Sequence, residues 1–135
     1  AEFRAEDKEL LGADIIISSP YTRALQTAAT ISRVTGIKLT VENDLHEWMP
    51  DTTHKFMIED FRALYSNYRE LKGVRPDDSI YNWETYQSLK DRLFTVLDKY
   101  KHLNKVIVVC HGLIMSAAGD FEELFDFVEK KEIIY

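Results

Sequence analysis

Three side chains in this sequence are suited to binding and transferring an anion: an arginine, a histidine and a glutamate. Arg23 follows Pro20 by three positions, in the first turn of an expected helix. Its guanidinium would lie beside free backbone N–H groups and the positive end of the helix dipole. A planar, permanently charged guanidinium binds two phosphate oxygens at once, which a lysine cannot imitate. From its position alone, however, Arg23 is more simply an ordinary surface residue.

His111 directly follows the apolar run 106–110 and precedes Gly112. An imidazole in this position lies at the rim of a sheet, and a glycine lets a backbone N–H come close to a ligand. For a lone histidine, a structural role in the core is the simpler alternative. With Arg23, these two residues are candidates for an anion-binding site.

Glu47 lies between His46 and Trp48 in an expected loop. A carboxyl group beside an indole loses hydration, which raises its pKa and suits it to proton donation. A hydrated surface carboxylate is the alternative.

Two other chemistries are excluded by spacing. A cysteine phosphatase loop needs an arginine six positions after the cysteine, but Ser116 stands there relative to Cys110. The sequence has no Cys-x-x-Cys and no His-Glu-x-x-His, so we expect no metal. Because neighbours in a strand point to opposite faces, we expect Cys110 to pack in the core, away from His111.

The apolar pattern predicts the elements that position these residues. A β-branched run predicts a strand at 15–17, followed by a helix from Pro20 to Gly36 with Ser19 as its N-cap. Further strands are expected at 37–41, 106–110 and 132–135, and further helices at 57–71, 86–100, 113–118 and 120–130. The run 106–110 is continuously apolar, which is typical of an interior parallel strand. This order predicts an α/β fold, a three-layer sandwich with a mainly parallel sheet, whose ligands bind beyond the carboxyl ends of the strands.

The composition is that of one globular domain spanning residues 1–135. The chain has 17 basic and 23 acidic residues, and its net charge of −6 repels nucleic acid and anionic membranes. No apolar run is long enough to span a bilayer, no secretory signal is visible, and there is one cysteine. We therefore expect a cytoplasmic protein without nucleic-acid or membrane partners; the oligomeric state is open.

Three segments together resemble the histidine phosphatase superfamily, whose best-known branch is phosphoglycerate mutase: residues 18–27 (SSPYTRALQT), 45–47 (LHE) and 106–112 (VIVVCHG). The resemblance extends over residues 10–118. A weaker stretch, Glu84 to Tyr86 with Arg92, is similar to the family's Gly-Glu-Ser helix start, although Trp83 replaces the glycine. The resemblance implies a phosphoglycerate mutase-like fold in which Arg23 and His111 bind the phosphate, Glu47 donates the proton, and no metal or cofactor takes part.

In this family, a histidine in an Arg-His-Gly motif on the first strand attacks the phosphate and becomes phosphohistidine. The sequence has no such motif before Ser18, so we expect the first strand and the catalytic loop to lie upstream of Ala1. That strand is interior in the family's sheet, so we expect residues 1–135 alone to fold poorly.

The resemblance implies that the intact protein is a phosphomonoesterase for a small phosphorylated substrate. Three alternatives remain: a pseudophosphatase that only binds phospho-ligands, a phosphomutase, and a domain used for protein contacts. A mutase is less favoured because a chain this short leaves little room for the insertions that shield its intermediate. We expect the loops 42–53 and 73–83 to set specificity, with their aromatic residues, Trp48, Tyr81 and Trp83, packing against the helices.

Overall fold

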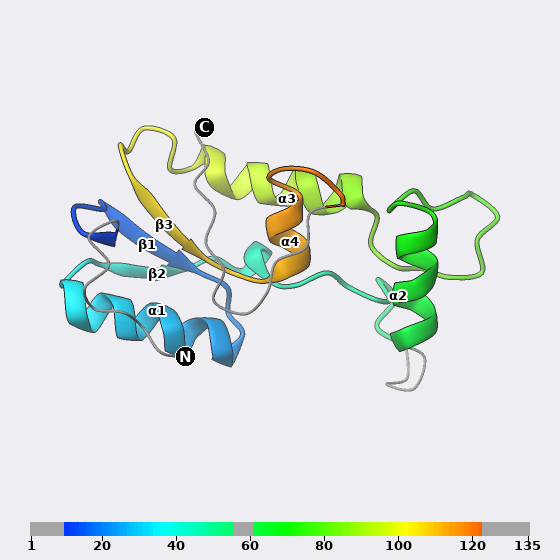
Figure 1. The fold of residues 1–135 in the computed structure, drawn as a ribbon, viewed down its shortest axis with the longest axis horizontal. Helices are drawn as coiled ribbons and strands as arrows, with labels where there is room; N and C mark the ends of the chain where they lie inside the picture. Colours follow the sequence, from blue (N-terminus) through cyan, green and yellow to red (C-terminus); the bar gives the residue numbers. More distant parts are fainter. Residues whose placement is uncertain (1–9, 56–60, 123–135) are drawn as a thin grey trace.

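The computed structural model describes residues 10–55 and 61–122, which form a parallel sheet with helices around it (Figure 1). The elements are β1 (Ile15–Ser18), α1 (Thr22–Thr35), β2 (Leu39–Val41), the short 3-10 helix η2 (Asn43–Leu45), α2 (Phe61–Glu70), α3 (Tyr86–Asp98), β3 (Val106–Val109) and α4 (Gly112–Ser116). The strand order is β2-β1-β3, and both pairings are parallel. The predicted α/β fold with a parallel sheet is therefore confirmed.

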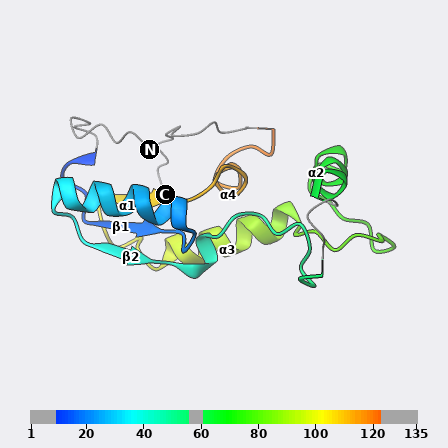
Figure 2. The same ribbon diagram turned by 90° about the horizontal axis from the view of Figure 1, so that it is seen from below.

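The alternation of side chains along β1 creates two apolar layers. Ile16 packs with Ala28 and Ile31 of α1, while Ile17 belongs to a cluster on the other face that includes Leu93 of α3. The side chains of Ile16, Ile17, Ala28 and Ile31 are at most 5% exposed. Burying each isoleucine side chain contributes about 2 kcal/mol to stability. Figure 2 shows α1 and α3 on opposite sides of the strands. The sheet is therefore the middle of three layers, as predicted.

β3 lies at an edge of the described sheet, although its continuously apolar run is typical of an interior strand. Its Ile15↔Val106 register places it beside β1, and no described strand pairs with its other edge. Both faces are nevertheless covered: Val106 and Val108 pack on the α3 side, and Ile107 and Val109 on the α1 side. The continuous apolar run therefore reflects two covered faces, while all four residues remain only half-buried.

α1 begins two residues later than predicted. Its N-cap is Tyr21, which makes no side-chain capping bond. Ser19, the predicted N-cap, instead bonds through its hydroxyl to His111. The predicted stop at Gly36 is confirmed, because this residue adopts a left-handed conformation with φ of 76° and its N–H donates to the Ser32 carbonyl.

The remaining element boundaries shift by a few residues. The second strand is shorter than predicted and covers only Leu39–Val41, while α3 ends at Asp98 rather than at residue 100. Residues 121 and 122 form a turn where a helix was expected, and the rest of that helix, the predicted strand 132–135 and Met57 lie outside the described residues. None of the described helices is long and apolar enough to cross a membrane.

Gly73 follows α2 at a close approach between two segments. Its φ is 74°, and a Cβ added there would overlap the Cβ of Tyr86. We expect Gly73→Ala to lower the free energy of unfolding by about 3 kcal/mol, because a left-handed alanine is strained and Tyr86 must move. Gly36→Ala is the matched control, because Gly36 has a similar φ of 76° but a Cβ added there meets nothing within 4 Å. Its expected loss is about 1 kcal/mol. Equal losses in urea unfolding would contradict the steric argument.

Candidate active site at the carboxyl edge of the sheet

Ser19 and His111 meet because β1 and β3 end side by side. Ser18 pairs with Val109 in the register, and the Ser19 N–H donates to the Val109 carbonyl at 2.9 Å. Ser19 directly follows β1, and His111 lies two residues after the end of β3. The Ser19 Oγ is 2.7 Å from Nε2 of His111. Both residues are buried, with 0% and 5% of their surface exposed.

His111 lies in a positively charged environment. Burial lowers its pKa to about 4, and the nearby charge of Arg23 acts in the same direction, with smaller contributions from His46 and Arg92. His111 is therefore a neutral imidazole at pH 7. The ring of Tyr21 lies 4.9 Å from that of His111.

Arg23 is in the first turn of α1, as predicted, although the helix begins at Thr22 rather than at Pro20. Its side chain is exposed and forms no ion pair with any described residue. Its positive charge acts to lower the pKa of His111. An exposed guanidinium at the same edge of the sheet as a neutral imidazole can bind an anion.

The carboxylate of Glu47 accepts three backbone N–H bonds. One comes from Trp48 at 2.8 Å, and two come from Leu113 and Ile114 in the first turn of α4, each at 3.1 Å. These bonds bring Glu47 to the segment that directly follows His111. The indole of Trp48 points to the core and donates to the Glu84 carbonyl at 2.7 Å.

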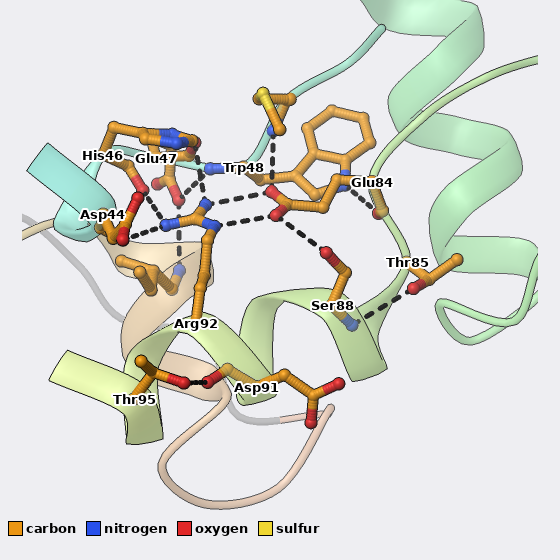
Figure 3. Close-up of polar contacts among 12 residues, drawn as sticks. Asp44, His46, Glu47, Trp48, Glu84, Thr85, Ser88, Asp91, Arg92 and Thr95 are labelled. Atoms are coloured by element: carbon orange, nitrogen blue, oxygen red, sulfur yellow. Dashed lines mark hydrogen bonds and ion pairs between the residues drawn. The ribbon is translucent and has the colours of Figure 1, made fainter. Parts of the chain in front are cut away.

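Arg92 ties the loop that carries Glu47 to α3 (Figure 3). Its Nε and Nη2 donate to the two carboxylate oxygens of Glu84, at 2.7 and 2.9 Å. It also donates to the carbonyls of Asp44, His46 and Glu47. The Glu84 side chain is 1% exposed, so this is a buried ion pair.

The sequence analysis named Glu84 and Arg92 only as part of a resemblance and missed their role in holding the loop. Glu84 lies just before the N-cap of α3, and Arg92 lies within that helix. It also missed the contact of Ser19 with His111, because the local sequence predicted that Ser19 is the N-cap of the first helix.

A hollow of about 500 Å³ lies beside Arg92. It is lined by Asp44, Thr85, Gln87, Ser88, Asp91, Arg92 and Thr95. Neither Arg23 nor His111 contributes to it, and its two aspartates make it unsuited to a phosphate.

Four residues predicted from the sequence thus lie at one edge of the sheet: Arg23 in α1, Glu47 after η2, and His111 with Gly112, the first residue of α4. Cys110 packs against the main core, and burial raises the pKa of its thiol to about 12. It therefore behaves as an inert apolar residue, as expected.

Trp48 and Trp83 are 4% and 0% exposed, and Tyr81 packs against the same core. These aromatic residues pack against their neighbours, as predicted.

Comparisons with known proteins identify the family and the fold of this chain. The sequence matches the family model for the histidine phosphatase superfamily (branch 1) over residues 3–120. Similar solved structures include a mycobacterial glucosyl-3-phosphoglycerate phosphatase in complex with inorganic phosphate, with a TM-score of 0.63 and 18% identity over 84% of this chain and 60% of that one. Another is the α-ribazole phosphatase from Shigella flexneri, with a TM-score of 0.55 and 20% identity over 83% of this chain and 59% of that one.

No curated protein matches the chain in sequence. The chain spans about three fifths of the length of these solved structures. At such identities their likeness shows the fold, which is the phosphoglycerate mutase-like α/β fold expected from the sequence. Because the family model covers most of the sequence, the chain belongs to the histidine phosphatase superfamily.

Proposed function

We propose that the intact protein hydrolyses phosphomonoesters through a phosphohistidine intermediate. Arg23 and His111 bind the phosphoryl group, with Gly112 allowing its close approach, and Glu47 protonates the leaving oxygen. The attacking histidine belongs to the family's Arg-His-Gly motif, which the 135 residues do not contain. The ester P–O bond breaks as a P–N bond forms, and water then cleaves the P–N bond to release inorganic phosphate. No metal takes part.

One observation carries this proposal: a neutral imidazole lies at the carboxyl edge of a parallel sheet together with a guanidinium that forms no ion pair with any described residue. The Ser19 Oγ lies 2.7 Å from Nε2 of His111, and the positive charge of Arg23 lowers the pKa of that imidazole. Phosphoryl transfer needs mainly positioning and stabilisation of negative charge, which fixed N–H donors and a guanidinium supply.

The names of the similar structures support a small phosphorylated substrate. One is a phosphatase of glucosyl-3-phosphoglycerate, whose structure holds inorganic phosphate, and another is an α-ribazole phosphatase. We extend only this substrate class to the present protein.

We also propose a cytoplasmic location and no nucleic-acid partner. The net charge of −6 disfavours phosphate backbones, and one half-buried cysteine suits a reducing compartment.

Arg23→Lys tests the phosphate-binding role. Lysine keeps the charge but loses the fork that binds two oxygens, so we expect kcat/KM of the intact protein for p-nitrophenyl phosphate to fall about 30-fold. Arg33→Lys is the matched control, because Arg33 is an exposed arginine in the last turn of the same helix, and its activity should be unchanged.

Equal activity of the two variants would contradict the role of Arg23. An intact protein that binds inorganic phosphate in calorimetry but hydrolyses no phosphomonoester would instead be a phospho-ligand binding module. Activity that is lost on chelation with EDTA would contradict the metal-free mechanism.

A further inference from the structure

The hydroxyl of Ser19 is fully buried and has two partners. The Tyr21 N–H donates to Ser19 Oγ at 3.2 Å, and Nε2 of His111 lies 2.7 Å from the same oxygen. The neighbouring Ser18 hydroxyl donates to the Ser19 carbonyl at 2.9 Å and does not compete for this oxygen.

These contacts decide where the proton of the Ser19 hydroxyl points. A serine hydroxyl has one proton and two acceptor positions. If Nε2 of His111 carried a hydrogen, Ser19 would accept from both partners, and its own proton would have no acceptor among the described residues. Such an unsatisfied buried donor costs about 2 kcal/mol. If Nε2 is unprotonated, Ser19 donates to it and accepts from Tyr21, so the proton and the acceptor position of this buried hydroxyl are both satisfied.

These contacts favour the tautomer of the neutral imidazole that carries its hydrogen on Nδ1. None of residues 10–55 and 61–122 bonds to Nδ1 of His111, and this nitrogen is not among their buried atoms without a partner, so within this part of the chain it is accessible to a ligand. An N–H at this position would attract a phosphoryl oxygen, whereas the lone pair of the other tautomer would repel it.

We propose that Ser19 is a positioning residue that holds neutral His111 in its Nδ1–H form, so that His111 presents a hydrogen-bond donor to phosphate. The Tyr21 N–H donates to the Ser19 hydroxyl, which in turn donates to Nε2 of His111. The backbone at Tyr21 thereby fixes the orientation of the imidazole. Only the catalytic consequence of this arrangement rests on the proposed function; the tautomer itself does not.

The test is ¹⁵N NMR of the histidine side chains in the intact, labelled protein at pH 7. The wild-type spectrum should show His111 protonated at Nδ1 only. Ser19→Ala should move the signal towards the Nε2–H form, whereas Ser19→Thr, which retains a hydroxyl, should preserve Nδ1–H. Ser18→Ala is the matched control, since it removes a neighbouring buried hydroxyl that does not touch the imidazole.

A second measurement follows the ligand. The dissociation constant of inorganic phosphate should rise about tenfold in Ser19→Ala, equivalent to about 1.4 kcal/mol, and should be unchanged in Ser18→Ala and Ser19→Thr. A wild-type Nε2–H form, or an Nδ1–H form that persists in a folded Ser19→Ala protein, overturns the role of Ser19. An Nδ1–H signal in a protein without phosphatase activity supports that role and counts against the proposed function alone.

Discussion

Replacing His111 with alanine is expected to lower kcat/KM of the intact protein about a thousandfold. His111 sits at the end of β3 with its imidazole fixed by Ser19 and buried from water. A preorganised donor in a water-poor site stabilises the developing charge of a transferring phosphoryl group far more than a donor in water does, and removing one costs two to three orders of magnitude in rate. Steady-state hydrolysis of p-nitrophenyl phosphate measures the effect.

His102→Ala is the matched control for this variant. His102 is an exposed histidine in the turn between α3 and β3, and its removal should leave the rate unchanged. His111→Ala also removes the imidazole that accepts from the Ser19 hydroxyl, so circular dichroism must show that this variant is folded. A folded His111→Ala protein that keeps a tenth or more of the wild-type rate would contradict the assignment.

Arg92→Met is expected to lower the free energy of unfolding by about 4 kcal/mol. The substitution leaves the Glu84 carboxylate buried without a counter-charge, and removing one partner of a buried pair typically costs 3–5 kcal/mol. The carbonyls of Asp44, His46 and Glu47 also lose their common donor. Urea unfolding of the intact protein measures the loss.

Two further variants separate the sources of this loss. Glu84→Gln combined with Arg92→Met removes the uncompensated charge, so the double variant should be more stable than Arg92→Met alone. Lys99→Met removes a surface pair with Glu42, whose lysine side chain is 53% exposed, and should cost less than about 1 kcal/mol. If Arg92→Met lowers the free energy of unfolding no more than Lys99→Met does, the bonds of Arg92 to Glu84 and to the loop that carries Glu47 do not stabilise the fold.

The strands and their faces could be predicted because their signals are local. The alternation at residues 15–17 decides which side chain meets α1 and which meets α3, and the run 106–109 shows that both faces are covered. Gly36 ends α1 because its left-handed conformation suits glycine, a property of one residue.

Features that depend on distant partners could not be predicted in this way. A serine before a proline is a good local N-cap, but the hydroxyl of Ser19 instead bonds to the imidazole of His111, 92 residues away in the sequence. Arg92 bonds to three backbone carbonyls, which every residue possesses, so no side-chain type in that loop reveals the contact. Covered faces likewise do not reveal whether a strand lies at an edge.

The grouping of Arg23, Glu47 and His111 follows from topology. Parallel strands end at the same edge, so residues placed just after β1, β2 and β3 converge there. The sequence could therefore indicate which residues gather, while the bonds that orient them required the structure.

The strand order has a consequence for how the site assembles. β1 pairs with β2 across a short crossover, Ile16 with Leu39, whereas its pairing with β3 joins Ile15 to Val106 and closes a much longer loop. Closing a longer loop costs more chain entropy and is slower. Arg23 belongs to the early-closing β1-α1-β2 unit, while His111 arrives only with β3. Local undocking of β3 would thus separate the imidazole from the guanidinium while leaving that unit paired, so the site can be no more persistent than the contact between β1 and β3.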